Sequence, residues 1–368
     1  MKPSFIELAR PQVQSMQPYQ AGKPVEQAQR ELGIEKFVKL ASNENPRGPS
    51  AAVIAAINQA GQEVNRYPDA NGYYLKQILA EMHQVEAHCI TLGCGSNDIL
   101  ELIASAYLDQ HCSAVVSQYA FLVYGLAIAR SGAATIEVPA LDYGHDLAAM
   151  NAAALENTRV IYLANPNNPT GTYATYEELL ALLEGLPSSV LVVLDEAYCE
   201  YIDNPNYPDG IALQKKYPNL IVTRTFSKAY GLGGLRVGYS ISDPAIADAM
   251  NRVRQPFNVS SVSLAAAQAA LADSAYLDSS VAYNNQGMRQ LSEGFQSLGV
   301  GYIDSAANFV TFKAPYDAAV LNQDLLAKGV IVRPLANYQM ADYLRVSIGL
   351  EDENRFFLQA LAELLDAK

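Results

Sequence analysis

The feature that most constrains the fold is a series of short, unbroken apolar runs in the middle of the chain. They cover residues 114–116, 160–163, 190–194 and 220–222. Runs of this length suit strands that are buried on both faces of a parallel sheet. Between two of the runs, Thr175 and Glu178 form a capping-box pattern ahead of a leucine-rich stretch, which predicts a helix. Strands that alternate with helices predict an α/β fold with a mainly parallel sheet flanked by helices.

The pattern changes after about residue 256. A helix-forming stretch includes residues 265–271, shorter strand candidates follow at 309–312, 330–332 and 344–348, and an amphipathic helix closes the chain. A chain of 368 residues is also longer than one compact core usually holds. We therefore predict a large domain at residues 46–255 and a smaller α/β domain at residues 256–368. The N-terminal segment, residues 1–45, is expected to pack on the small domain.

Composition excludes several classes of function. The net charge of −13 disfavours nucleic acid as a partner. No apolar run approaches the ~20 residues that span a bilayer, and the N-terminus has no signal-peptide core. The four cysteines and four histidines lack the spacing of metal ligands, so no metal site is expected. Four scattered thiols suit a reducing cytoplasm, where we expect the protein to reside.

Polar residues gather directly after three of the apolar runs. Asn-Pro-Asn-Asn-Pro-Thr-Gly occupies 165–171, Asp-Glu-Ala-Tyr occupies 195–198, and Thr-Phe-Ser-Lys-Ala-Tyr-Gly occupies 225–231. In open α/β sheets, ligands bind outside the carboxyl ends of the strands. The three segments therefore predict a single site at one edge of the sheet.

Lys228 and Asp195 stand out within these segments. A single lysine is usually a solvated charge, but Lys228 lies between the aromatic residues Phe226 and Tyr230 and is followed by glycines. A lysine desolvated there would be a nucleophilic amine, as Schiff-base chemistry requires. Asp195 ends a buried run and needs a partner. A helix cap or an ion pair would serve, and so would a pyridinium N–H.

Other segments could bind anions or form turns. Ser96 and Asn97 precede an apolar helical stretch, so they are either a plain N-cap or part of an anion site at the helix start. Arg236 follows the glycine-rich stretch and could clamp a phosphate. The Asn168-Pro169 bond is a candidate cis peptide within a turn sequence.

Taken in order, these segments resemble the fold-type I aminotransferases that depend on pyridoxal 5'-phosphate, over essentially the whole chain. The matching motifs are Gly-Ser-Asn at 95–97, the two segments at 165–171 and 195–198, and Ser-Lys-Ala-Tyr-Gly-Leu-Gly-Gly-Leu-Arg at 227–236. Further stretches at 18–24, 40–50, 66–69, 329–334 and 344–349 resemble the histidinol-phosphate aminotransferases within that superfamily.

The resemblance implies a role for each matching residue. Lys228 would form the Schiff base with the cofactor, and Asp195 would pair with its ring nitrogen. The ring's phenolic oxygen would be held by Asn168 and Tyr198. The remaining roles are stacking on the ring by Phe121 (with Tyr119 and Tyr124 as alternatives), phosphate binding by Ser96, Asn97, Ser227 and Arg236, and substrate binding by Tyr19, Arg333 and Arg345. Tyr67 would reach the phosphate from the partner subunit, which implies a homodimer.

The implied reaction is transamination between histidinol phosphate and 2-oxoglutarate, giving imidazole acetol phosphate and glutamate, in histidine biosynthesis. An arginine pair binds phosphate and carboxylate alike, so it discriminates poorly between substrates. Three alternatives therefore remain open. They are an aromatic amino-acid aminotransferase, a decarboxylase of a phosphorylated amino acid that uses the same cofactor, and a cofactor-binding regulator without turnover.

Overall fold

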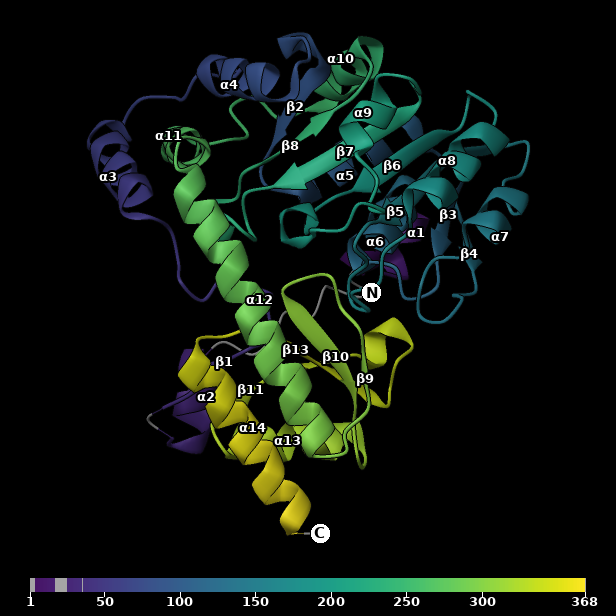
Figure 1. Ribbon diagram of the computed structural model, residues 1–368. Helices are drawn as coiled ribbons and strands as arrows, with labels where there is room; N and C mark the ends of the chain where they lie inside the picture. Colours follow the sequence, from purple (N-terminus) through teal and green to yellow (C-terminus); the bar gives the residue numbers. More distant parts are fainter. Residues whose placement is uncertain (1–3, 17–24, 35, 368) are drawn as a thin grey trace.

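The computed structural model describes residues 4–16, 25–34 and 36–367. Its centre is a seven-stranded sheet (Figure 1). The strands lie in the order β2 (Ile90–Gly93), β8 (Gly238–Ile241), β7 (Leu220–Thr225), β6 (Leu191–Asp195), β5 (Thr158–Ala164), β3 (Ser113–Ser117) and β4 (Ala134–Val138). Strand β8 runs antiparallel to both of its neighbours, and the other pairs are parallel. The predicted mainly parallel α/β sheet is confirmed, and each of the four apolar runs lies in or overlaps one of its strands.

Successive residues of the central strands point to opposite faces of this sheet, and both faces are buried. In β5, Ile161 and Leu163 join one apolar cluster, whereas Val160 and Tyr162 join the other. The first cluster is covered by α3 (Ala51–Ala60), α4 (Tyr73–His83), α7 (Leu147–Ala152), α8 (Tyr176–Gly185), α9 (Gly210–Gln214) and α11 (Ser261–Leu271). The second is covered by α5 (Ser96–Tyr107), α6 (Leu122–Ser131) and α10 (Pro244–Val253). Burial on both faces explains why the strand sequences are continuously apolar.

The long helix α12 (Ser274–Ser297) leads from the large sheet to a smaller one (Figure 1). This four-stranded antiparallel sheet has the order β12 (Arg333–Pro334), β13 (Tyr343–Ser347), β10 (Phe309–Lys313) and β9 (Tyr302–Ile303). Helices α12, α13 (Ala318–Ala327) and α14 (Glu351–Asp366) share an apolar core with it. Phe295, Phe312 and Phe357 are fully buried at the centre of that core.

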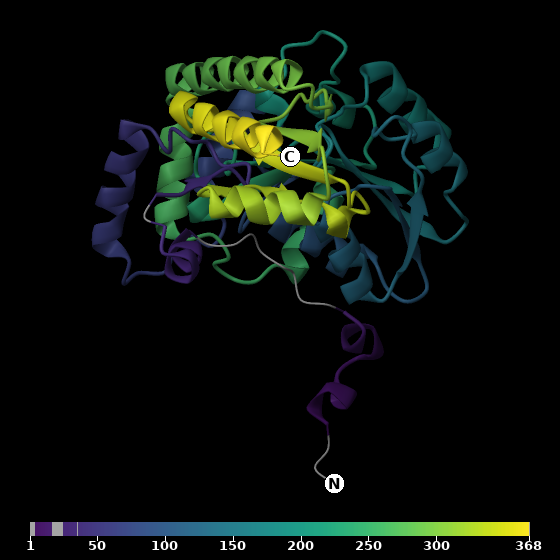
Figure 2. The same ribbon diagram turned by 90° about the horizontal axis from the view of Figure 1, so that it is seen from below.

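The N-terminal segment divides between the two parts of the molecule. Helix α2 (Val25–Leu32) packs near β11 (Val330–Ile331), which pairs in parallel with β1 (Val38–Lys39). In contrast, η1 (Phe5–Leu8) and α1 (Pro11–Gln14) extend from the body of the molecule (Figure 2). Helix α1 contacts α6, and Arg10 donates a hydrogen bond of 3.2 Å to the Arg130 carbonyl. Helix α11, beyond residue 255, adds its apolar side chains to the core of the large sheet. The domain division at residues 45 and 255 stays a prediction.

The topology brings the polar segments to one edge of the large sheet. Strands β5, β6 and β7 are parallel neighbours, so residues 165–171, 195–198 and 226–231 all leave the sheet at the same side. The capping box of α8 is present as predicted, with the Thr175 hydroxyl accepting from the Glu178 amide. Short 3-10 helices occupy several of the loops: η2 (Gly61–Glu63), η3 (Ala87–Cys89), η4 (Cys199–Tyr201), η5 (Gly233–Leu235) and η6 (Ala336–Tyr338).

Candidate active site

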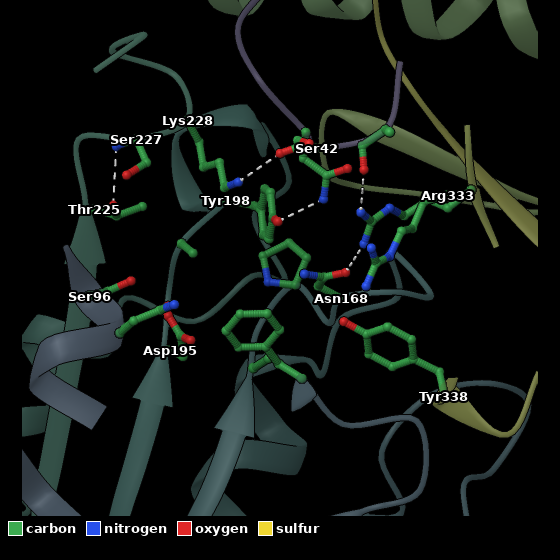
Figure 3. A pocket seen from close by; sticks show the side chains of 18 of the residues that line it. Ser42, Ser96, Asn168, Asp195, Tyr198, Thr225, Ser227, Lys228, Arg333 and Tyr338 are labelled. Carbon is green, nitrogen blue, oxygen red and sulfur yellow. Dashed lines mark hydrogen bonds between the residues drawn. The ribbon is translucent and has the colours of Figure 1, made fainter. Parts of the chain in front are cut away.

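A cavity of about 200 Å³ lies at the carboxyl ends of the large sheet's strands, where the smaller sheet closes over them (Figure 3). Both sheets and the segment after β1 contribute to its walls. The lining residues are Ala41, Ser42, Asn43, Ser96, Asn97, Phe121, Ala164, Pro166, Asn168, Asp195, Ala197, Tyr198, Thr225, Ser227, Lys228, Arg236, Arg333, Tyr338 and Arg345. Eleven of the thirteen residues that the sequence singled out for the site are therefore in one place.

The Lys228 side chain points into this cavity from the loop that follows β7 (Figure 3). Its Nζ donates a 3.4 Å hydrogen bond to the Ser42 carbonyl and lies 5.6 Å from the centre of the Tyr198 ring. Burial is the largest cause that lowers the pKa of this amine to about 8, and the nearby Arg345 guanidinium acts in the same direction. An amine with a lowered pKa is neutral more often and is therefore a better nucleophile.

Asp195 is the last residue of β6 and is held by two hydroxyl donors. Tyr124 donates to its Oδ2 at 2.8 Å, and Thr223 donates to its Oδ1 at 3.1 Å. Burial raises the pKa of this carboxyl group, while both hydrogen bonds and the charge of Lys228 oppose that rise. A buried carboxylate that lines a cavity can pair with a protonated nitrogen of a ligand.

Two positive groups meet at another wall of the cavity. Helix α5 begins at Ser96, with Gly95 as its N-cap at a φ of 78°. Arg236 donates to the Ser227 hydroxyl at 3.2 Å and to the Gly233 carbonyl at 2.9 Å. A Cβ at position 95 would collide with the Arg236 guanidinium, so the glycine permits this close approach. The free amides of a helix start and a guanidinium together form an anion site.

Arg333 and Arg345 form a second basic wall, on the smaller sheet. They are paired across β12 and β13, and are 8% and 5% exposed. Arg345 donates to the Asn168 side-chain oxygen and, at 3.1 Å, to the Ala41 carbonyl, and its guanidinium lies over the Phe309 ring. Like charges opposite each other in a sheet are unfavourable, so an anion bound between them would be stabilising.

Two further groups can donate to a ligand oxygen. The Tyr198 hydroxyl accepts a 2.9 Å hydrogen bond from Asn43, which leaves its own proton for another acceptor. The Asn168 oxygen accepts from Arg345, so its amide nitrogen is the end that can donate to a ligand. Both residues line the cavity with Lys228 and Asp195.

The structure distinguishes the three aromatic residues that the sequence left open. Phe121 lines the cavity at the start of α6. Tyr124 is fully buried behind it and bonds to Asp195. Tyr119 stacks with Tyr143, 6.4 Å between ring centres. Of these three residues, Phe121 is the one that lines the cavity and can contact a planar ligand there.

Two expectations were wrong, and two of the predicted site residues are not among those that line the cavity. The cis peptide bond is Asn165-Pro166, not Asn168-Pro169. The N-cap of α5 is Gly95 rather than Ser96 or Asn97. Tyr67, which was expected to act at the partner subunit's site, is 84% exposed and stacks on Phe257, and its crossing stays a prediction. Tyr19 lies outside the described residues.

Sequence reasoning assigned no role to several lining residues, among them Ser42, Asn43 and Tyr338. Ser42 and Asn43 fall within the stretch at 40–50 that carried the family resemblance, which was a usable signal. Tyr338 lies in η6 and had no local signal. In the described part of the chain, no cluster of three potential metal ligands occurs, and no helix is long and apolar enough to cross a membrane.

Comparison with known sequences places the chain among the aminotransferases. The family model "Aminotransferase class I and II" matches residues 35–361. Histidinol-phosphate aminotransferase 2 of Pseudomonas fluorescens (strain Pf0-1) is 54% identical over 367 residues, which cover 99% of each chain. The protein of the same name from Pseudomonas aeruginosa is 53% identical, and the match covers 98% of each chain.

Solved structures of aminotransferases also match the chain. The histidinol-phosphate aminotransferase from Sinorhizobium meliloti, in complex with pyridoxal-5'-phosphate, matches with a TM-score of 0.88 and 32% identity over 97% of each chain. An aspartate aminotransferase variant from Thermus thermophilus has the same fold, with a TM-score of 0.84 at 23% identity over 97% of this chain and 99% of that one. The predicted fold is thereby confirmed, and the chain belongs to the class I and II aminotransferase family.

Proposed function

We propose that the protein is a pyridoxal-phosphate-dependent aminotransferase that exchanges the amino group of histidinol phosphate with 2-oxoglutarate, within histidine biosynthesis. Support comes from relatives named histidinol-phosphate aminotransferase that match nearly the full chain at about 50% identity. The observation that carries the proposal is a buried lysine, a buried carboxylate and an anion cradle around a single cavity.

The residues present fit pyridoxal phosphate. Lys228 offers an amine for its aldehyde, and Asp195 offers a carboxylate for its ring nitrogen. The space that Gly95 leaves beside Arg236 and the start of α5 suits its phosphate. When bound, the cofactor supplies an aldehyde that takes up the amino group and a ring that accepts electrons from the substrate's α carbon.

Lys228 transfers the proton of the substrate's α carbon. With its pKa lowered to about 8 by burial, Nζ is neutral often enough near neutral pH to remove the proton from the α carbon of a bound substrate. The Nζ group then holds that proton for redelivery on the same face. Ser42 and the Tyr198 ring, which contact the amine, limit the directions in which it can reach.

The other lining residues bind the cofactor and orient it. Asp195 keeps a ring nitrogen protonated, and Phe121 covers one face of the ring. The Asn168 amide and the Tyr198 hydroxyl are the donors for the ring's phenolic oxygen, while Ser96, Asn97, Ser227 and Arg236 bind the phosphate.

The substrate's anionic end is assigned to Arg333 and Arg345. A guanidinium matches a phosphate or a carboxylate equally well, so the same pair can receive the phosphate of histidinol phosphate and a carboxylate of 2-oxoglutarate. Both arginines are largely buried, which strengthens their attraction for an anion. The N-terminal Tyr19 remains a candidate for substrate selection.

The proposal is tested by product analysis of the purified protein loaded with pyridoxal phosphate. We expect glutamate and imidazole acetol phosphate to form in equal amounts from histidinol phosphate and 2-oxoglutarate, and Lys228→Ala to abolish both. Faster turnover with phenylalanine would favour the aromatic aminotransferase alternative, release of CO2 would favour the decarboxylase, and no turnover at all would favour the regulator.

We also propose a homodimer in which Tyr67 of the partner subunit reaches the cofactor phosphate. Support comes from large apolar side chains exposed on and around α3, α4 and the segment between them: Ile54, Val64, Tyr67, Tyr73, Tyr74, Ile78, Met82 and Phe257. Exposed large apolar side chains that lie close together in the chain are typical of a protein interface. The four cysteines are free thiols, which supports the proposed cytoplasmic location.

Mixed dimers test the crossing of Tyr67. Lys228→Ala subunits are refolded together with Tyr67→Phe subunits, each of which is impaired when assembled with itself. If Tyr67 acts across the interface, half of the sites in a mixed dimer combine an intact Lys228 with an intact Tyr67, and activity rises above that of either parent. No rise on mixing, in a protein shown to be dimeric by ultracentrifugation, would contradict the crossing.

A further inference from the structure

Tyr124 contacts the site's carboxylate without lining the cavity. It lies on α6, three residues after Phe121, and its side chain is 0% exposed. Its hydroxyl donates a 2.8 Å hydrogen bond to Oδ2 of Asp195. A buried tyrosine needs a partner for its hydroxyl, but a backbone carbonyl would satisfy that need. A partner that is itself the charged group of the site indicates a role in function.

The ring of Tyr124 is fixed on two sides. It stacks on Tyr162, with 5.1 Å between ring centres and 16° between planes. It also meets the edge of Phe121 at 5.7 Å and 87°. Close packing leaves such a ring a single orientation, so the hydroxyl is held in place toward Asp195. The Tyr124 side chain therefore supports both Phe121 and Asp195, which line the cavity.

The groups that face Asp195 come from three directions. Tyr124 approaches from α6, Thr223 from β7, and Lys228 from the loop after β7. Burial raises the pKa of the carboxyl group, and the Tyr124 hydrogen bond is the largest of the interactions that lower it. The backbone N–H of Ala197 acts in the same direction. Without the hydroxyl of Tyr124, the effect of burial would be opposed less strongly.

We propose that Tyr124 is a positioning residue that keeps Asp195 ionised and correctly oriented, so that the shared proton stays on the cofactor's ring nitrogen. This inference rests on the proposed function, because it assigns the ring nitrogen to Asp195. Two sites compete for one proton, the ring nitrogen and a carboxylate oxygen. Loss of the Tyr124 donor makes the carboxylate more basic, and the proton moves from the nitrogen to the oxygen. A ring with a neutral nitrogen accepts electrons less well, so proton removal from the substrate slows.

Tyr124→Phe isolates the hydroxyl, because it keeps the ring that packs on Tyr162 and Phe121. Tyr162→Phe is a matched control. Tyr162 is also fully buried and lies in the same apolar cluster, but its hydroxyl donates to the Leu100 carbonyl at 3.3 Å rather than to the site. The two variants lose the same atom from neighbouring rings.

The readout is the ¹⁵N chemical shift of the ring nitrogen in holoenzyme loaded with ¹⁵N-labelled pyridoxal phosphate. We expect the shift of a protonated nitrogen in the wild type and in Tyr162→Phe, and a move toward the unprotonated value in Tyr124→Phe. Turnover should fall ~10-fold in Tyr124→Phe with KM unchanged, the scale of one hydrogen bond to a charged group. Thr223→Val removes the other hydroxyl donor and should move the shift in the same direction.

The outcomes separate the inference from the proposed function. A wild-type protein that fails to bind pyridoxal phosphate would overturn the proposed function. A wild-type protein that binds it, with the same protonated shift in Tyr124→Phe, would overturn the role of Tyr124. If Tyr124→Phe does not fold, Thr223→Val decides the matter, and an unchanged shift in that variant would refute tuning of Asp195 by its hydroxyl donors.

Discussion

Lys228 should be unusually reactive in the protein without cofactor. Burial and the neighbouring Arg345 lower the pKa of its amine from 10.5 to about 8. At pH 7, roughly one-tenth of such an amine is neutral, against roughly one part in 3,000 for an ordinary lysine. The neutral, nucleophilic population is therefore roughly 300-fold larger.

Competitive labelling measures this population directly. Apoprotein is treated with a trace of labelled acetic anhydride between pH 6 and 10, and the label on each lysine is quantified by mass spectrometry. The exposed Lys313 serves as the internal reference. Labelling of Lys228 should rise ~10-fold per pH unit below its pKa of about 8 and level off above it. In Arg345→Gln, which loses a cation that lowers the pKa, the plateau should begin at higher pH. Labelling of wild-type Lys228 that still rises tenfold per unit up to pH 10 would refute the reasoning.

Three further predictions concern the charged groups. Asp195→Asn should keep the cofactor bound but slow turnover by ~10²-fold, as measured in single-turnover assays, and an unchanged rate would give Asp195 another role. Arg333→Gln should raise KM for histidinol phosphate by ~10-fold or more with a smaller effect on kcat, since it removes a charged hydrogen-bond donor; an unchanged KM in steady-state kinetics would remove Arg333 from the substrate site. Arg224→Met should lower the free energy of unfolding in urea by ~3–5 kcal/mol, because Glu196, bonded to it at 2.7 Å and 0% exposed, would be left as an unpaired buried charge. The control Arg252→Met breaks a pair that is 77% and 61% exposed and should cost less than ~1 kcal/mol, so equal losses would contradict the account.

The strands that the sequence predicted are those in the middle of the sheet. Central strands such as β5 and β6 are buried on both faces, so their sequences are unbroken apolar runs. Strand β4 lies at the edge with mostly exposed or half-buried residues, and β8 contains glycine and serine. Neither strand has a sequence pattern that predicts it, because each forms only by pairing with its neighbours in the folded sheet.

The site was predictable where its residues follow strands. Asp195 ends a buried strand, and Lys228 and Asn168 lie in loops that leave buried strands. The order of parallel strands brings these strand ends together. Asn43 bonds to Tyr198 across 155 positions of sequence, and Tyr124 bonds to Asp195 across 71. Contacts of this kind depend on the finished tertiary structure, so the local sequence does not show which residues are paired.

The two proline bonds show the same limit. The sequence from 165 to 169 contains two Asn-Pro pairs, and composition alone could not assign the cis bond to Asn165-Pro166. In the structure, Asn165 is fully buried, and its side chain exchanges hydrogen bonds with the backbone of Ala174. These hydrogen bonds to Ala174, nine residues further along the chain, distinguish Asn165 from Asn168.

The most direct test of the whole account is an absorbance titration of the purified protein with histidinol phosphate. The protein should carry the visible band of lysine-bound pyridoxal phosphate, and the substrate should convert it stoichiometrically to the pyridoxamine form. Lys228→Ala should lack the band, since no other amine lines the cavity in the described part of the chain. A wild-type protein without the band, or a band that histidinol phosphate leaves unchanged while another amino donor converts it, would contradict the account.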